Sequence, residues 1–399
     1  MVTATREEAA ALKSEIAELR HSIHAEPEIG LELPKTQHKV VSALAGLPLE
    51  ISTGQGLSSV TAVLRGGRPG PTVLLRGDMD ALPVTERTGV PYESVIPGAM
   101  HACGHDLHTS MLVGAAKLLA ARQAELPGNV IFMFQPGEES VGGARIMIEE
   151  GVLDAAGERP AAAYALHVAS GLLPLGIAAS KAGACMAAAD KLHVTVRGRG
   201  GHGAQPHHAA DPIPVACEIV TALQALVTRK FDVFDPVVIT VGTFHAGTVD
   251  NVIPDEANFV ATVRTFSPHA RDLVKETSVR LARELAGAHG LTADVEYEDV
   301  YPVTINDGSE FEFARRTVGN VFGEHRFVTA PNPLTGSEDF SYVLERVPGA
   351  FVMVGACPPE TDPLNAPFNH SAEAVFDDGI IPDGISLYAE LALRRLAAG

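Results

Sequence analysis

The chain has 399 residues, 46% of them hydrophobic, and its 49 acidic residues outnumber its 30 lysines and arginines to give a formal net charge of −19. The hydrophobic share excludes disorder of the whole chain, and the length predicts two domains if each holds roughly 150 residues. The negative charge argues against nucleic acids and anionic membranes as partners, because both require a basic surface. The N-terminal segment lacks the apolar core of a signal peptide, and no uncharged apolar run reaches the ~18 residues of a membrane helix, so we expect a cytoplasmic protein.

The first part of the chain alternates between helical patterns and short apolar runs that are typical of buried strands. Strands that are apolar on both faces and separated by helices indicate a mainly parallel sheet with helices on both sides, which is an α/β fold. The sequence predicts helices over 5–25, 108–122 and 142–153 and strands over 71–81, 129–139 and 161–168.

After about residue 184 the pattern changes to strict alternation of apolar and polar residues, which indicates antiparallel strands with one solvated face. We therefore predict that residues 185–297 form a smaller α+β domain, inserted into a parent domain made of 1–184 and 298–399. An apolar run over 350–356 is expected to complete the parent sheet. Within the inserted domain we expect strands over 191–200, 236–247 and 256–266 and helices over 211–229 and 268–289.

Polar side chains follow three of the predicted strands of the parent sheet. Asp78 and Asp80 come after the first strand, Glu138 and Glu139 after the second, and His167 lies near the end of the third. In an open parallel sheet, ligands bind beyond the carboxyl ends of the strands. We therefore expect these side chains to converge on one crevice.

The densest polar cluster is the segment MHACGHDLH, which contains His101, Cys103, His105, Asp106 and His108. Thiolate and imidazole are ligands that zinc and similar transition metals prefer. Cys103 and His105, with a glycine between them, can both point at one centre from an extended loop. A lone buried cysteine is usually only a small hydrophobic residue, but five such groups ahead of a helix favour metal binding. For His101, Asp106 and His108, two roles stay open: binding the metal, or orienting a residue that binds it.

The pair Glu138–Glu139 provides carboxylates directly after a buried strand. Adjacent residues that leave a strand project in different directions, so one carboxylate can hold a metal while the other faces a water molecule. A metal lowers the pKa of water from about 15.7 toward about 7, and a nearby carboxylate takes the proton and passes it to the leaving group. Two adjacent glutamates are also common in solvated loops. The catalytic interpretation therefore depends on their position directly after a buried strand.

Two further groups of histidines lie outside these clusters. His370 stands alone in a loop, where a histidine is more often structural or solvated. The segment RGRGGHGAQPHHAADP holds His202, His207 and His208, which would permit a second metal site. A loop that contacts substrate is the favoured interpretation there, because no cysteine or aspartate sits at matching spacing.

Taken in order, these motifs resemble the zinc-peptidase-like amidohydrolases, a family that includes carboxypeptidase G and the aminoacylases. HACGHD is similar to the branch of hippurate hydrolases and indoleacetyl-amino-acid hydrolases. The resemblance covers about residues 15–395. It rests on RGDMDALP, MHACGHDLHTSMLVGAA, FQPGEES, ALHV, GGHGAQPHHAADPI, GTVDNVIPDEA, ATVRTF, GSEDF and FNHS.

The resemblance implies a centre with two divalent metal ions, which the ligand types allow to be zinc, manganese or cobalt. Cys103 matches the bridging ligand, which other branches supply as aspartate. His105, His167, Glu139 and His370 match the terminal ligands. Arg76 departs from the wider family, because it stands where other branches place a ligating histidine, so the two metals are expected to differ in affinity or identity.

The resemblance also implies catalytic and substrate-binding roles. Glu138 matches the general base and Asp78 the carboxylate that orients a ligating or substrate-facing group. His202 resembles the histidine that reaches the neighbouring subunit's active site and polarises the scissile carbonyl. Asn251 and Arg264 resemble groups that hold the carboxylate of the substrate.

The implied activity is metal-dependent hydrolysis of small N-acyl amino acids to a carboxylic acid and a free amino acid, in a homodimer or homotetramer. Water activated by the metal would attack the acyl carbonyl, with Glu138 as base. The inserted domain would serve as a lid and for dimerisation. Two alternatives stay open: a metal-independent thiol amidase with Cys103 as nucleophile and His105 as base, and a metal-containing binding protein without turnover.

Overall fold

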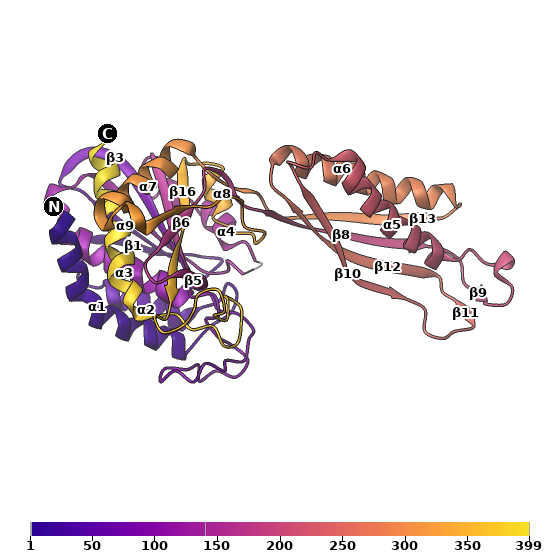
Figure 1. The fold of residues 1–399 in the computed structure, drawn as a ribbon, viewed down its shortest axis with the longest axis horizontal. Coiled ribbons are helices and arrows are strands. Elements are labelled where there is room, and N and C mark those ends of the chain that lie inside the picture. The colour runs from indigo at the N-terminus through magenta and orange to yellow at the C-terminus, as the bar shows by residue number, and fades with distance from the viewer. Residues whose placement is uncertain (1, 140, 399) are drawn as a thin grey trace. The chain divides into compact units, whose positions relative to one another are not determined.

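The computed structural model describes residues 2–139 and 141–398, which form two compact units (Figure 1). Unit 1 consists of Met1–Cys185, Ile305–Asn332 and Asp339–Gly399, and unit 2 of Met186–Thr304 and Pro333–Glu338. The sequence placed the inserted domain at 185–297. The main segment of unit 2 runs further because its last strand ends at Tyr301.

Unit 1 is built on an eight-stranded sheet with the order β1-β2-β4-β3-β5-β16-β6-β15. In its centre β3 is parallel to both β4 and β5, and β16 is parallel to β5, whereas the pairs β1–β2, β2–β4 and β16–β6 are antiparallel. The predicted α/β class with a mainly parallel sheet is therefore confirmed. The strands are β1 (Leu49–Thr53), β2 (Val60–Arg65), β3 (Arg68–Asp78), β4 (Pro127–Gln135), β5 (Ala162–Pro174), β6 (Ala178–Ser180), β15 (Phe327–Thr329) and β16 (Gly349–Cys357).

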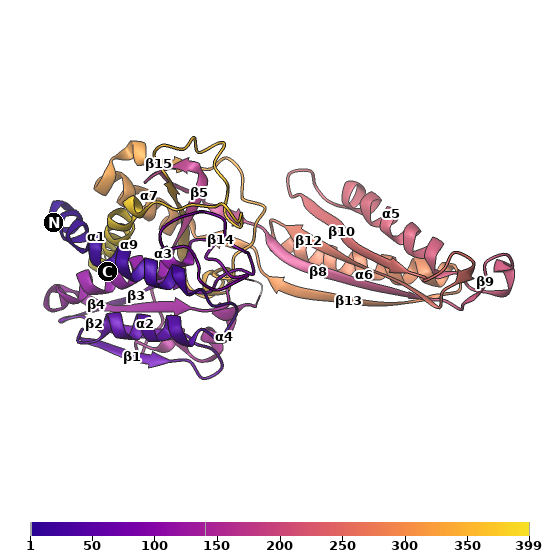
Figure 2. The same ribbon diagram turned by 90° about the horizontal axis from the view of Figure 1, so that it is seen from below.

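Helices α1, α3 and α9 pack against one another, and α3 and α9 also contact the sheet at β3 (Figures 1 and 2). Helix α4 contacts β4 and α8. The α-helices of unit 1 are α1 (Val2–Ala25), α2 (Pro34–Leu44), α3 (His105–Ala120), α4 (Gly143–Glu149), α7 (Gly308–Phe322), α8 (Ser341–Leu344) and α9 (Ile381–Ala397). Short 3₁₀ helices cover Gln123–Glu125, Val152–Asp154, Glu324–Arg326 and Asp378–Ile380.

The core of unit 1 explains why the central strands are apolar along their whole length. Val73 and Leu75 on β3, Val130 and Phe132 on β4 and Tyr164 on β5 are fully buried members of one hydrophobic cluster, which α3 and α9 also enter. Strands covered by other structure on both faces read as continuous apolar runs. The same runs end abruptly at polar residues, and those residues lie at the carboxyl edge of the sheet.

Unit 2 contains a four-stranded antiparallel sheet with the order β10-β12-β8-β13, together with the helices α5 and α6 (Figure 2). Alternate residues of β8 and β12 are buried in a second hydrophobic cluster with residues of both helices. Its elements are β8 (Ala188–Arg197), β9 (Gly201–His202), α5 (Pro212–Lys230), β10 (Val237–Ala246), β11 (Val252–Ile253), β12 (Glu256–Thr265), α6 (Pro268–Ala288) and β13 (Thr292–Tyr301), with a 3₁₀ helix over Pro206–His208. Strands β9 and β11 pair with each other, and so do β7 (Gly183–Met186) and β14 (Thr304–Asn306).

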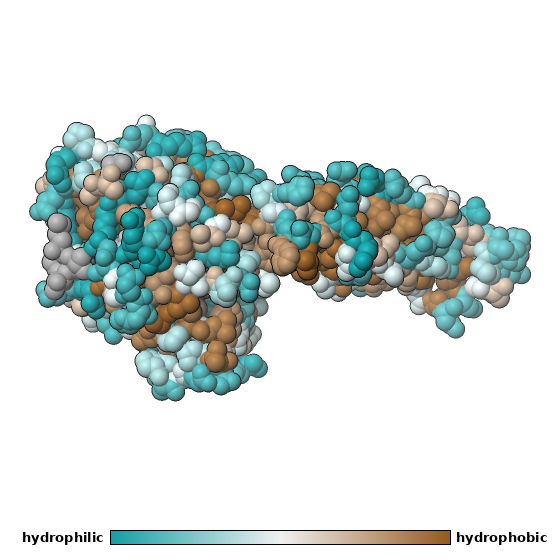
Figure 3. All heavy atoms as spheres, turned by 45° about the horizontal axis from the view of Figure 1, so that its top comes forward, coloured by the Kyte–Doolittle hydropathy of each residue, from teal (hydrophilic) through white to brown (hydrophobic). Residues whose placement is uncertain are grey.

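Hydrophilic residues predominate on the face shown in Figure 3, and apolar residues lie among them on both units. The most exposed large hydrophobic side chains include Phe234 at 93%, Val233 at 79% and Leu364 at 77%. No helix within the described ranges has both the length and the apolar character that spanning a membrane requires.

Candidate metal centre

Three neighbouring strands supply polar side chains of the candidate centre: β3 and β4 at and after their carboxyl ends, and β5 beyond the point where its pairing with β3 ends. Asp78 is the last residue of β3 and pairs in register with Gln135, the last residue of β4, so the loop with Glu138 begins beside it. His167 lies on β5, beyond the point where the pairing of β5 with β3 ends. The parallel register therefore brings these groups to one edge of the sheet, as the sequence predicts.

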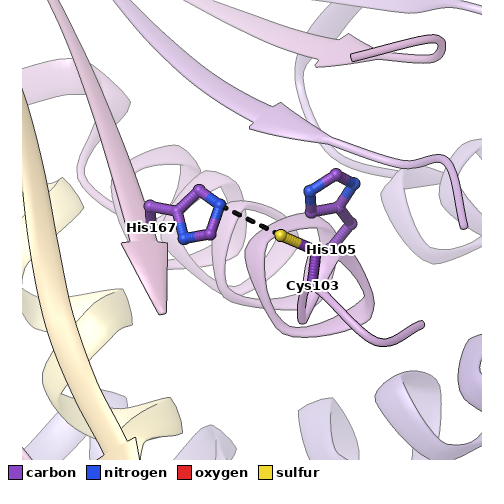
Figure 4. Close-up of side chains that lie close together, drawn as sticks. All are labelled: Cys103, His105 and His167. Carbon is purple, nitrogen blue, oxygen red and sulfur yellow. Dashed lines mark hydrogen bonds between the residues drawn. The ribbon is translucent and has the colours of Figure 1, made fainter. Parts of the chain in front are cut away.

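A first group of possible metal ligands consists of Cys103, His105 and His167 (Figure 4). One donor atom from each lies within 4.8 Å of the others, and Cys103 Sγ is 3.5 Å from His167 Nε2. The segment is not the extended loop that the sequence suggested. Gly104 takes φ +80° as the N-cap of α3, which begins at His105, and a Cβ at this glycine would lie 2.3 Å from a methyl group of Val168. Glycine is needed here for both reasons.

A second group consists of Cys103, Glu139 and His370. His370 Nε2 lies 3.2 Å from Cys103 Sγ and 3.2 Å from Glu139 Oε1. The two groups share the thiol of Cys103, so four other side chains, His105, Glu139, His167 and His370, lie around one sulfur atom. This is the arrangement that two metal ions with one bridging ligand require.

The histidines of the first group are oriented to offer Nε2 lone pairs. His105 Nδ1 donates to the backbone carbonyl of Asp80 at 2.8 Å, and His167 Nδ1 donates to the carbonyl of Val168 at 2.9 Å. His105 Nε2 is buried without a hydrogen-bond partner among the described residues. A carbonyl that accepts from one ring nitrogen fixes the tautomer and leaves the other nitrogen free to bind a metal.

The electrostatics of the cluster favour a cation. The thiol of Cys103 and the carboxylate of Glu139 raise the pKa of His370 to about 10. Burial lowers the pKa of His167 well below its ordinary value, which keeps this imidazole in the neutral form that binds metals. Thiolate, imidazole and carboxylate together fit zinc and similar divalent transition metals.

The loop that carries His370 is held by its neighbour Asn369. The Asn369 amide donates to the carbonyl of Val168 at 2.9 Å and to that of Cys103 at 3.3 Å, and the His370 N–H donates to the Ala102 carbonyl at 2.8 Å. His370 has φ +73°, a left-handed conformation that is costly for a residue with a Cβ. Such strain persists where surrounding contacts fix it, and these bonds aim the side chain at Cys103.

Asp80 holds the backbone of the glutamate pair. Its carboxylate accepts the N–H of Glu138 at 3.0 Å and the N–H of Glu139 at 2.9 Å. Carboxylate oxygens of both glutamates come within 4.8 Å of a His105 ring nitrogen. The two carboxylates therefore lie beside the same imidazole, with Glu139 also at His370 and Glu138 buried next to the cluster.

Asp78 is fully buried between two other side chains. Its Oδ1 lies 2.5 Å from His108 Nδ1 and its Oδ2 lies 2.5 Å from Arg76 Nη1. Burial would raise the pKa of Asp78, but Arg76, His105 and His108 lower it well below its ordinary value. Arg76 also donates to Asp339 at 2.9 Å. Arg76 thus contacts two buried carboxylates and contributes a fixed positive charge.

The remaining predicted site residues all lie in unit 2. His202 is exposed on β9, where its Nδ1 accepts the N–H of Ala204 at 3.1 Å, and the Asn251 carbonyl accepts the N–H of Gly203 at 2.8 Å. Arg264 is half-buried on β12, and no carboxylate in the described part of the chain lies within 4.0 Å of it. Burial lowers the pKa of this guanidinium.

Three residues at the centre gain roles that the sequence did not assign: Asp80, His108 and Asn369. Asp80 and His108 stood in the polar clusters, but nothing in their spacing shows which backbone groups they bind. Asn369 precedes the ligand candidate His370, and only the motif FNHS, which contains both residues, pointed to a role for it. All three act through hydrogen bonds to segments far away in the sequence, which a single sequence does not reveal.

At the carboxyl edge of the mixed sheet, two groups of possible metal ligands share the sulfur of Cys103. Residues 74–394 match the family model described as peptidase family M20/M25/M40, and the chain belongs to this family. The predicted resemblance is confirmed. The protein is an amidohydrolase of a family that carries dinuclear metal centres.

Similar proteins match over nearly the whole chain. Thermostable carboxypeptidase 2 of Saccharolobus solfataricus is 35% identical over 383 residues, which is 95% of each chain. The hippurate hydrolase of Campylobacter jejuni is 35% identical over 388 residues, covering 96% of this chain and 97% of that one. A Bacillus subtilis crystal structure, described as a dinuclear metal binding peptidase from the M20 family, superposes with a TM-score of 0.83 at 32% identity and covers 97% of this chain and 99% of that chain.

Proposed function

We propose that the protein hydrolyses the amide bond of N-acyl amino acids and releases a carboxylic acid and a free amino acid. The observation that carries the proposal is the pair of donor groups that share Cys103, with the carboxylate of Glu138 beside them. A relative named hippurate hydrolase, similar over almost the whole length, supports a substrate of this class.

Two divalent cations, which we propose to be zinc, manganese or cobalt, would be held by the two groups. Cys103, His105 and His167 would bind one, and Cys103, Glu139 and His370 the other. When bound, such cations polarise a carbonyl oxygen and lower the pKa of water. The thiol that both groups share would have to be ionised, which the nearby positive charge of the cations favours.

Glu138 is the proposed general base. Its carboxylate takes a proton from the attacking water and returns it to the nitrogen of the departing amine. The Asp80 carboxylate fixes the backbone N–H groups of Glu138 and Glu139, so the base and the ligand stay in one orientation. Asp78 has a supporting role in this proposal, because both its oxygens are bound by His108 and Arg76.

We propose that unit 1 is the catalytic domain and unit 2 a lid and dimerisation domain in a homodimer or homotetramer. The exposed imidazole of His202 would bind the scissile carbonyl oxygen in the neighbouring subunit. Asn251 and Arg264 would hold the carboxylate of the substrate. A half-buried guanidinium that forms no ion pair with any described residue supports this role for Arg264, because such a group gains from a carboxylate ligand. A cytoplasmic location stays a prediction.

The test is a panel of N-acyl amino acids, from acetyl to benzoyl and indoleacetyl derivatives, assayed with protein loaded with cobalt, manganese or zinc. We expect turnover that Glu138→Gln abolishes while metal content stays at the wild-type value. Activity that survives complete chelation would instead favour a thiol amidase, with Cys103 as nucleophile and His105 as base. Bound metal without hydrolysis of any compound would favour a binding protein.

A further inference from the structure

His108 lies at the centre of a buried chain of hydrogen bonds that ends beside a proposed metal ligand. Its Nδ1 faces Asp78 Oδ1 at 2.5 Å, and its Nε2 accepts the backbone N–H of Val168 at 2.7 Å. Asp78 is bound in turn by Arg76 at 2.5 Å. Val168 directly follows His167. This series of hydrogen bonds therefore links the buried Arg76–Asp78 ion pair to the backbone beside His167, a candidate metal ligand.

The partners of His108 define its chemical state. A carboxylate only accepts hydrogen bonds, so Nδ1 carries a proton, and a backbone N–H only donates, so Nε2 presents its lone pair. His108 is therefore a neutral imidazole with both nitrogens used. Its donor atom lies within 4.8 Å of those of Asp78 and His105, but neither of its nitrogens is free to bind a metal.

Strand β5 needs this support at the point where it carries His167. The pairing of β5 with β3 ends at Arg76 and Ala165. Beyond that point the N–H of Leu166 donates to the hydroxyl of Tyr388 at 3.2 Å, and the N–H of Val168 donates to His108. Side chains thus replace β3 along this edge of β5, just before and just after His167, while β16 continues to pair with the other edge.

We propose that His108 is a positioning residue for the Cys103–His105–His167 half of the metal centre. It fixes the backbone on the carboxyl side of His167, and its ring lies with centroids 4.6 Å from that of His167 and 5.3 Å from that of His105. Asp78 keeps the His108 proton on Nδ1, so that Nε2 can accept the N–H of Val168. The Cys103–Glu139–His370 half is held mainly by Asp80 and Asn369, and it is linked to His108 only indirectly, because Asn369 donates to the carbonyl of Val168. The inference rests on the proposed metal centre.

The test is a calorimetric titration of zinc into the full, chelator-stripped chain, in the presence of a competing chelator, for four proteins. Wild type is expected to bind two zinc ions. His108→Phe should weaken one binding step 10- to 100-fold, the usual cost of removing a group that orients a metal ligand, and should change the other step much less. His108→Gln should stay within a few-fold of wild type, because its amide can accept from Val168 and donate to Asp78.

His101→Phe is the matched control. His101 is a buried histidine of the same segment, and neither of its ring nitrogens has a hydrogen-bond partner among the described residues. Replacing it should leave both binding steps as in wild type. Ring-nitrogen NMR of wild type should show the proton of His108 on Nδ1.

A second variant, Asp78→Asn, tests the same proposal if His108→Phe does not fold. Asp78→Asn would present an amide N–H to His108 Nδ1 and so move the ring proton to Nε2. There the proton faces the Val168 N–H, and the hydrogen bond to Val168 is lost. The zinc-binding step of the Cys103–His105–His167 half should therefore weaken, as in His108→Phe. Unchanged zinc binding in the folded His108 variant, or equal weakening of both steps, would overturn the positioning role alone. A wild-type chain that binds no zinc would overturn the metal centre as well.

Discussion

Replacement of Asp80 by asparagine tests how the glutamate pair is held. Asp80 is 1% exposed, and each of its carboxylate oxygens accepts one backbone N–H, from Glu138 at 3.0 Å and from Glu139 at 2.9 Å. An asparagine of the same shape has one accepting oxygen, and its NH₂ group would face the second N–H. The variant therefore loses one hydrogen bond to a charged group and leaves a buried N–H unpaired.

A hydrogen bond to a charged group contributes about 1.5–3 kcal/mol, so we expect the free energy of unfolding of Asp80→Asn to fall by about that amount. Urea unfolding with chelator present measures this loss without a contribution from bound cations. In the metal-loaded protein, kcat should fall at least tenfold, because the backbone that carries both the base and a ligand is released, and a tenfold loss corresponds to about 1.4 kcal/mol.

Glu150→Gln is the matched control. The Glu150 carboxylate also accepts two backbone N–H groups, from Gln55 at 3.1 Å and Gly56 at 2.7 Å, but it is exposed, so water replaces a lost bond. Its unfolding free energy should change by no more than about 0.5 kcal/mol. The reasoning is refuted if Asp80→Asn is as stable as Glu150→Gln, or if it keeps wild-type kcat.

Three other predictions follow from single contacts. His202→Ala should cut turnover far more than metal content, and equal losses of both would contradict its assigned role. Arg264→Ala should raise KM for N-acyl amino acids, measured by initial rates, and an unchanged KM would count against carboxylate recognition. Burial alone would lower the pKa of His24, but Asp106 and Glu86 outweigh it and raise the pKa to about 9. The stability that His24 contributes is complete below its unfolded pKa of about 6.5 and is lost as pH rises through about 9, so His24→Gln should flatten the pH dependence of urea unfolding across that window.

The parallel sheet, and the edge of it where the candidate site lies, could be predicted because both depend on local sequence patterns, apolar runs followed by polar residues. The apolar runs that become β3, β4 and β5 lead into Asp78, Glu138 and His167, and parallel pairing of the three strands brings these residues to one edge of the sheet. Strand β13 was missed because charged residues dominate it: Asp294, Glu296, Glu298 and Asp299 lie in a strand whose apolar residues before Tyr301 are only half-buried. Its pairing with β8 explains why unit 2 extends beyond residue 297.

The finer geometry of the site depends on contacts between distant segments. The sequence suggested an extended loop at Cys103, but Gly104 packs against Val168 and starts α3 at His105 instead. The left-handed backbone of His370 could not be predicted from the sequence, because it is held by hydrogen bonds to distant segments, from Asn369 to Val168 and Cys103 and from the His370 N–H to Ala102.

The two halves of the proposed centre differ in how they are supported. The guanidinium of Arg76 binds Asp78 and Asp339, and Asp78 is bound in turn to His108, whose ring packs beside those of His105 and His167. The half with His105 and His167 therefore rests on rigid, fully buried groups of α3 and the sheet. The half with Glu139 and His370 rests on two loops, and His370 itself is exposed. Because a loop moves at lower cost than a buried strand, we expect the cation at the Glu139 and His370 half to exchange first when a chelator is added.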